Sequence, residues 1–285
     1  MIIFHDPVCT DYSREGDPER PARITRTVPL LKERHPDWRW VQPVAATDEQ
    51  LLRAHSTDHV RHVAAPHGDF DLDTPAHPHI DRYARAATGA ALAAAASALH
   101  GEKALSLMRP PGHHAMRNRA MGFCYFSNIA VASLDALEHG TERVAIWDFD
   151  AHHGNGTEDI VEGNERIFFA SIHQYPGYPG TGTRSSVNCR NFPVAPHTPR
   201  TAHMEALTRS WEAVRAFKPD LVLVSAGFDA YAGDPITEMT LEPDDFASLG
   251  RWLSESALPA AAVLEGGYSP DLPLLIDAFL SAWEK

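Results

Sequence analysis

Six short, mostly apolar runs, each followed by a polar loop, constrain the fold of this chain more than any other feature. Runs of this kind are typical of strands that are buried on both faces of a parallel sheet. The expected strands are residues 2–4, 104–108, 143–149, 167–172, 221–226 and 260–264. Segments with helical character lie between them. The clearest is the alanine-rich segment 82–100, because alanine has the highest helix propensity. The other expected helices are 129–138, 204–217 and 271–283.

Strands that alternate with helices predict an α/β protein, in which a mostly parallel, multi-stranded sheet carries helices on both faces. No serine- or glycine-rich linker and no internal repeat divides the chain. The polar segment 67–79 has the composition of a surface loop. We therefore expect a single domain over residues 1–285.

The charge of the chain narrows the partners that it can bind. Lys+Arg 25 against Asp+Glu 38 give a net charge of -13, which disfavours nucleic acid and anionic membranes and favours cationic partners.

No apolar run approaches the ~20 residues that span a bilayer, and the first residues lack the basic region of a signal peptide. The 3 cysteines are far apart and form no CxxC pair, so we expect no disulfide framework and a cytoplasmic location. The oligomeric state stays open.

Loops that carry reactive side chains follow four of the expected strands. Two of the chain's 17 histidines, His113 and His114, follow strand 104–108. Asp229 follows strand 221–226, and a Gly-Gly pair with Tyr268 follows strand 260–264. Ligands of parallel α/β sheets bind beyond the carboxyl ends of the strands. We therefore expect these loops to share one rim with the loop after strand 143–149.

The loop after strand 143–149 carries metal-ligand chemistry. Asp148, Asp150 and His152 occupy alternate positions, so all three side chains point to one side of an extended chain. Asp150 and His152 could chelate one ion together with Asp229, and three protein ligands are the pattern of a catalytic zinc site. Two carboxylates and one imidazole also suit iron(II), cobalt or manganese, which stay as alternatives. An isolated Asp-x-His would more commonly cap the following helix.

The two adjacent histidines each need a hydrogen-bond acceptor, and Asp148 and Asn155 are available on the neighbouring loop. A carboxylate partner raises the pKa of a histidine, whereas a neutral amide does not. Two imidazoles that differ in this way suit general acid–base catalysis beside a metal. The phenol of Tyr268 could donate to a developing oxyanion.

At these residues the sequence resembles the zinc-dependent histone deacetylase family, which has the arginase–deacetylase fold. The resemblance is closest to its class II and bacterial histone deacetylase-like amidohydrolase branch, because Asn155 stands where another branch has aspartate. The matching segments occur in family order and are RPPGHHA (109–115), GFCYFSNIAVA (122–132), WDFDAHHGNGTEDI (147–160), SIHQYPGYPGTG (171–182), SAGFDAYAGDP (225–235) and LEGGY (264–268). A shorter match, ERPARI (19–24), lies near the N-terminus.

The resemblance implies a role for each of these residues. It implies that a catalytic Zn²⁺ is bound by Asp150, His152 and Asp229, and that the catalytic groups are His113, His114, Tyr268, Asp148 and Asn155. It implies an acyl-lysine channel lined by Gly122, Phe123 and Tyr178, with Ile236 at the position of a gatekeeper. It implies a structural K⁺ bound by Asp148, Asp150, His152, Ser171 and the main-chain carbonyl of Ile172. It also implies that Arg23 lies near an inner acetate cavity.

The activity implied is metal-dependent hydrolysis of N-acyl amines, in which a metal-activated water releases acetate and free amine. The substrate that we expect is N-ε-acetyl-lysine on a protein or peptide, because the loop 67–82 is short and Ile236 is apolar, which leaves the entrance open. An acetylpolyamine or another small N-acyl amide is the alternative.

Two rival functions are less favoured. The binuclear-manganese arginases need further carboxylates at the positions of Gly154 and Tyr231, so we expect one catalytic ion. A non-catalytic acyl-lysine binding module would be expected to have lost part of the catalytic set, and none of that set is lost.

Overall fold

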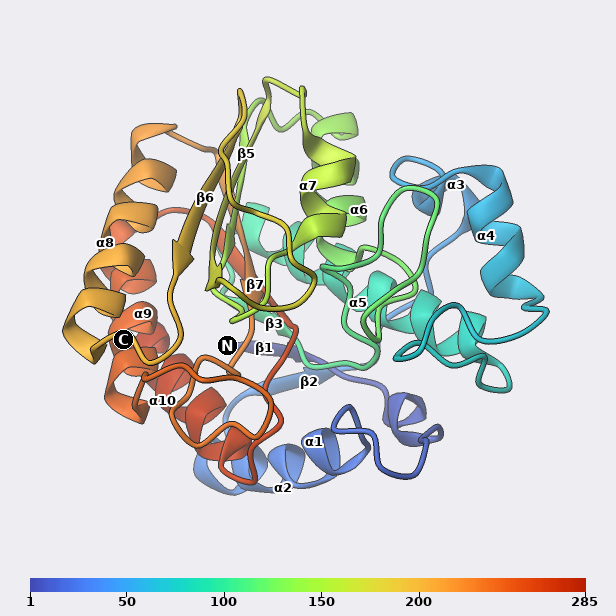
Figure 1. The fold of residues 1–285 in the computed structure, drawn as a ribbon, viewed down its shortest axis with the longest axis horizontal. Helices are drawn as coiled ribbons and strands as arrows, with labels where there is room; N and C mark the ends of the chain where they lie inside the picture. The colour runs from blue at the N-terminus through green and yellow to red at the C-terminus, as the bar shows by residue number, and fades with distance from the viewer.

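One eight-stranded sheet, parallel throughout, forms the centre of the computed structural model, which describes residues 1–285 (Figure 1). The strands are β1 (Ile2–Phe4), β2 (Arg39–Val41), β3 (Ala104–Ser106), β4 (Val144–Asp148), β5 (Ile167–Gln174), β6 (Cys189–Val194), β7 (Leu221–Ala226) and β8 (Ala260–Leu264). Their order across the sheet is β2-β1-β3-β8-β7-β4-β5-β6. The last strand in the sequence, β8, is thus an inner strand between β3 and β7.

All six expected strands are present, with ends that differ by a few residues. Two further strands, β2 and β6, lie at the two edges of the sheet. Neither is an apolar run, because an edge strand has one neighbour and one open side. In β6, Arg190 and Pro193 are exposed, and proline is tolerated at a sheet edge because it has no N–H to donate.

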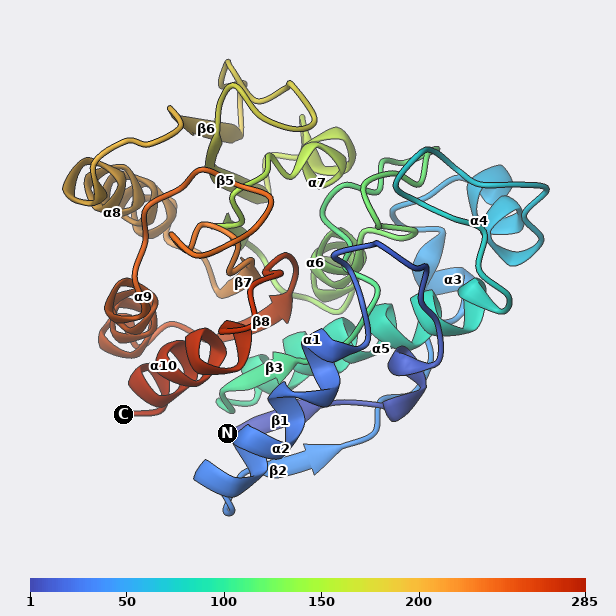
Figure 2. The same ribbon diagram turned by 60° about the horizontal axis from the view of Figure 1, so that its bottom comes forward.

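Helices cover both faces of the sheet, as predicted. Figure 2 shows α8, α9 and α10 on one side of the strands and α5, α6 and α7 on the other. The helices are α1 (Ala22–Thr25), α2 (Thr27–Arg34), α3 (Asp48–Leu51), α4 (Thr57–Ala64), α5 (Ile80–Leu99), α6 (Asn128–Glu138), α7 (Asn155–Val161), α8 (Arg200–Ala216), α9 (Pro243–Ser256) and α10 (Leu272–Glu284), with a 3₁₀ turn at Pro7–Thr10.

The long helix α5 lies against the sheet because its alanines allow a close approach. It is buried along most of its length, and a side chain at Gly89 would overlap the main-chain oxygen of Val44. The helix ends before Gly101, which has a φ of 83° and so takes the left-handed conformation that glycine favours.

Helix α9 is not among the expected helices, although a local signal marks its start. Glu242 and Asp245 form a capping box, with Pro243 in the first turn, and these features are typical of a helix N-terminus. None of the helices in the structure is both long and apolar enough to cross a membrane.

Candidate active site

The loops that carry the predicted site residues follow the carboxyl ends of neighbouring inner strands of the sheet. The strands β3, β8, β7 and β4 are adjacent in the strand order. Their ends are level, because Asp148 in β4 pairs with Ser225 in β7, and Ser106 in β3 pairs with Val263 in β8. The histidine pair, the tyrosine and the predicted metal ligands therefore converge, as expected from the sequence.

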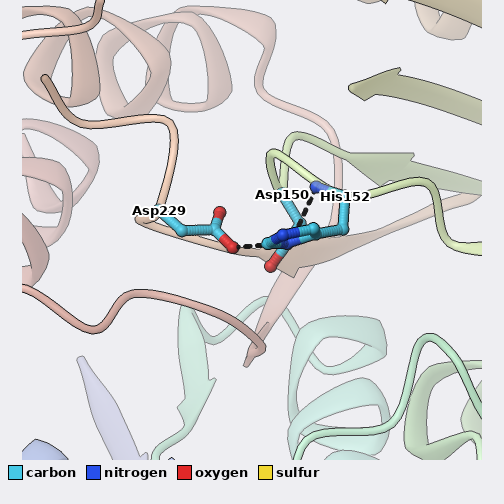
Figure 3. A group of neighbouring side chains, drawn as sticks. All are labelled: Asp150, His152 and Asp229. Carbon is cyan, nitrogen blue, oxygen red and sulfur yellow. Dashed lines mark hydrogen bonds and ion pairs between the residues drawn. The ribbon is translucent and has the colours of Figure 1, made fainter. Parts of the chain in front are cut away.

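The proposed metal ligands face one another among these loops (Figure 3). They are Asp150, His152 and Asp229. The Nδ1 atom of His152 lies 2.9 Å from Oδ2 of Asp229 and 3.1 Å from Oδ1 of Asp150. One potential ligand atom from each of the three residues lies within 4.8 Å of the others. Oxygen and imidazole ligands in this arrangement fit a divalent cation.

The charges of the trio favour a cation between its members. Both carboxylates are fully buried, and within the trio a single imidazole faces the two of them. Burial would raise the pKa of Asp150, but His113 and His152 outweigh it and lower that pKa. Burial and the neighbouring Asp150 raise the pKa of Asp229. A bound cation would offset this excess of negative charge.

Main-chain groups orient the two carboxylates. The N–H of Gly266 donates to Asp150 Oδ2 at 2.7 Å, and the N–H of Ala151 donates to Asp229 Oδ1 at 2.8 Å. A side chain at Gly227 would overlap the Asp150 carboxylate, and one at Gly266 would overlap Asp229. Glycine is therefore required at both positions for the chain to pass this close to the carboxylates.

The two adjacent histidines have the different partners that the sequence predicts. His113 Nδ1 lies 3.1 Å from Asp148 Oδ2, and His114 Nδ1 lies 2.8 Å from Asn155 Oδ1. Burial would lower the pKa of His113, but Asp150 and Asp148 outweigh it and raise that pKa to about 10. Burial and the nearby imidazoles lower the pKa of His114 well below its usual value. His113 is thus held as a cation and His114 as a neutral base.

Tyr268 lines the same cavity as His114 and His152 and is almost fully buried. Its ring centroid lies 6.0 Å from that of Phe123, and the Arg23 guanidinium lies 4.9 Å from the ring centroid on its face. Burial raises the pKa of the phenol well above its usual value. The hydroxyl is therefore a hydrogen-bond donor over the whole physiological pH range.

A cavity of about 280 Å³ leads from the surface to these groups. Its lining includes the four predicted channel residues together with His114, His152 and Tyr268. A side chain at Gly122, whose φ is 56°, would come within 2.7 Å of the His114 ring. Ile236 is partly exposed at the mouth. The lining thus combines an apolar wall with polar groups at its inner end.

Several residues of the site are absent from the sequence prediction. Pro18 and Asp73 also line the cavity, and the exposed Asp73 places a carboxylate at its mouth. Glu265 is fully buried and accepts the N–H groups of Gly112 and His113 at 2.7 and 3.1 Å. The segment LEGGY contains Glu265, but the spacing in the sequence does not indicate which loop its carboxylate contacts.

Three of the predicted residues do not line the cavity. Ser171 and Ile172 are buried in β5 beside the end of β4, and the Ser171 hydroxyl lies 2.9 Å from His173 Nδ1. Arg23 is buried and donates from Nε to the main-chain oxygen of Gly267 at 2.8 Å. The potassium site and the acetate cavity stay predictions.

Comparisons with known proteins identify the family and the fold of this chain. A family model described as histone deacetylase domain matches residues 17–281. A probable deacetylase of Methanothermobacter thermautotrophicus is 36% identical over 95% of this chain and 86% of its own length. The acetylpolyamine amidohydrolase of Mycoplana ramosa is 38% identical over 65% of this chain and 60% of its own length. A crystal structure of acetylpolyamine aminohydrolase from Burkholderia pseudomallei matches with a TM-score of 0.89 and 27% sequence identity, covering 99% of this chain and 98% of that one.

Proposed function

This chain belongs to the histone deacetylase family, and from that premise we propose that it hydrolyses the acetyl group from the ε-amine of acetyl-lysine in peptides or proteins. The products would be acetate and the free amine. We also propose that residues 1–285 form one deacetylase domain, since the family model spans residues 17–281 and a single sheet runs through the chain.

The observation that carries this proposal is the inner end of the cavity, where His114, His152 and Tyr268 meet. A neutral base, a phenol donor and a set of metal ligands there surround a space that an amide group could enter. Amide hydrolysis needs these three components: a base for water, a donor for the oxyanion and an electrophile.

The ligand trio would hold the metal ion, which we expect to be Zn²⁺, with iron(II) or another divalent ion as the alternative. When bound, such an ion polarises a carbonyl oxygen and lowers the pKa of water. Asp150, His152 and Asp229 would hold it, supported by the N–H groups of Ala151 and Gly266.

Side chains of this protein would then transfer the protons of the reaction. His114 donates its Nδ1–H to Asn155, which leaves Nε2 free to accept a proton from water and afterwards to protonate the leaving amine. The phenol of Tyr268 would donate to the carbonyl oxygen as negative charge develops on it. His113, whose pKa is raised by Asp150 and Asp148, lies beside His114 with their ring centroids 4.0 Å apart and would stabilise that charge from there.

The cavity and its rim support a cationic substrate with an extended apolar stem. Gly122 and Phe123 line the wall, which suits the methylene groups of a lysine side chain. Asp73 lies at the mouth, and the chain has a net charge of -13. Ile236 is apolar, so a peptide backbone would meet no charge at the gatekeeper position, and Asp73 is the carboxylate that it would meet at the mouth.

An acetylpolyamine is the second candidate substrate, because it shares the acetylated amine, the methylene stem and the positive charge. Two proteins similar to this chain are named for that substrate. Both candidates require the same chemistry at the inner end of the cavity and differ only in what lies at its mouth.

The deciding experiment compares kcat/KM of the zinc-loaded protein on an acetyl-lysine peptide and on an acetylated polyamine, with Asp229→Ala as the blank. A peptide preference that the variant abolishes would support the main proposal. The opposite preference would replace the peptide by the polyamine. If neither compound is hydrolysed, the proposed deacetylation is wrong.

A further inference from the structure

The loop between β7 and α9 contains a buried carboxylate, Asp234, that neither a metal nor a cationic side chain accounts for. Asp234 is only 7% exposed, and its carboxylate makes no ion pair. Oδ2 accepts the N–H groups of Tyr268 at 2.7 Å and Ser269 at 3.2 Å, and Oδ1 accepts the N–H of Ile236 at 3.1 Å. All of its partners are therefore main-chain donors.

The segment that Asp234 contacts lacks regular structure of its own. Gly266 and Gly267 precede Tyr268, and Gly267 has a φ of 117°, a conformation that other residues rarely adopt. Helix α10 begins only at Leu272. Secondary structure therefore does not fix the position of Tyr268. Contacts from other loops must fix it.

Such contacts lie along the whole segment. Gly266 donates to Asp150 and accepts from the N–H of Phe228, and the next three residues have two further partners. Arg23 Nε donates to the main-chain oxygen of Gly267 at 2.8 Å, and Asp234 accepts from the next two residues, Tyr268 and Ser269. Through its other oxygen, the same carboxylate holds Ile236 at the mouth of the cavity. Asp234 thus connects the inner end of the cavity to its entrance.

We propose that Asp234 is a positioning residue, which holds the phenol of Tyr268 at the inner end of the cavity in a fixed position relative to the entrance loop. This inference rests on the proposed hydrolysis, in which that phenol donates to the reacting oxygen.

Only a carboxylate satisfies all of these donors. Both of its oxygens accept hydrogen bonds, whereas an amide offers one oxygen and one NH₂ donor. In Asp234→Asn, the NH₂ group would face either the N–H of Ile236 or those of Tyr268 and Ser269. A donor placed against a donor breaks the hydrogen bond and leaves a buried group without a partner. The variant therefore changes the positions of the loops while it keeps the shape of the side chain.

The first test is kinetic and uses the metal-loaded protein. We expect Asp234→Asn to lower kcat by roughly 10- to 100-fold, the effect of a displacement of about 1 Å at a reacting centre, with unchanged metal content. In the Tyr268→Phe background, the same substitution should change kcat by less than about threefold, because the phenol that it positions is absent. An equal loss in both backgrounds, or loss of the metal, would overturn the proposal.

The matched control is Asp245→Asn. Asp245 is also a buried carboxylate that accepts a main-chain N–H, from Glu242 at 2.8 Å. Unlike Asp234 it also pairs with Arg200, and it caps helix α9 and does not line the cavity. It should lower the stability of the fold and leave kcat within about twofold. If both variants lower kcat equally, Asp234 acts only through stability and the proposal is wrong.

The second test does not depend on activity. In the wild-type protein, the amide hydrogens of Tyr268 and Ser269 should be protected from exchange with solvent, and Asp234→Asn should speed their exchange at least tenfold. The amides inside α10 should not change. Unprotected amides in the wild type would overturn the proposal without any variant. If the wild type hydrolyses no acylated amine, the proposed function fails, and the exchange result alone decides the position of the loop.

Discussion

The buried ion pair between Arg109 and Glu19 makes the sharpest prediction about stability. Arg109 is fully buried and donates from Nε to Glu19 Oε1 at 2.5 Å, from one terminal nitrogen to Oε2 at 2.7 Å, and from the other to the Cys9 main-chain oxygen at 2.7 Å. Burial would raise the pKa of Glu19, but Arg109 and Arg23 outweigh it and lower that pKa. The carboxylate is therefore buried in its charged form.

Replacing Arg109 by methionine keeps the apolar stem and removes the charge. Breaking a buried pair costs about 3–5 kcal/mol, because the remaining charge has lost its partner. Arg23 stays within 3.2 Å of Glu19, so we expect the lower end, about 3 kcal/mol. The entropy of unfolding of a chain of this size is about 0.6 kcal/mol per degree, and the melting temperature should therefore fall by about 5 °C.

The assay is urea and thermal unfolding, followed by circular dichroism, of the metal-free protein. The double variant Glu19→Gln/Arg109→Met should be no more stable than Arg109→Met alone, because it leaves the buried Arg23 guanidinium without its carboxylate partner. Arg39→Met is the control, since the Arg39–Glu102 pair is exposed and should contribute less than ~0.5 kcal/mol. A loss below ~1 kcal/mol for Arg109→Met, or a double variant more stable than the single one, would refute the reasoning.

Three further predictions concern the metal site, the base and the pH dependence of folding. Gly227→Ala should weaken zinc binding by about 100-fold, measured by competition with a chelator, because the new methyl group overlaps the Asp150 carboxylate. Asn155→Asp should move the acidic limb of the kcat/KM profile to higher pH by about one pH unit, since a carboxylate raises the pKa of His114. Burial lowers the pKa of His203 to about 4, so on acidification this histidine takes up a proton in the unfolded state before it does so in the folded state. The free energy of unfolding therefore decreases as the pH falls from about 6.5 toward 4. Between pH 7 and pH 5 this loss is about 2 kcal/mol in urea unfolding, and His203→Leu should lack it.

The inner strands of the sheet could be predicted from the sequence because burial on both faces requires apolar residues along the whole strand. The edge strands could not be predicted in this way. In β2, Arg39 is exposed and the two residues after it are partly exposed, so no apolar run marks the strand. Helix α9 could have been found from its capping box at Glu242 and Asp245, which is a local signal.

The convergence of the proposed metal ligands and the two histidines could be predicted because each follows a recognisable strand. Asp73 could not, since the segment around it has no periodicity and its exposed carboxylate has no pattern to mark it. Asp234 and Glu265 illustrate a different limit. Each accepts main-chain N–H groups from a segment distant in the sequence, and main-chain donors have no sequence signature at all.

The inner position of β8 has a consequence for how this protein is made. Until residue 264 has left the ribosome, β3 and β7 have no neighbour on the sides that β8 later joins. The nascent chain would then hold two partial sheets with open inner edges, which are prone to pair with other chains. Loss of residues 260–285 would likewise remove the strand that joins the two parts, so a truncated chain should aggregate in addition to losing Tyr268.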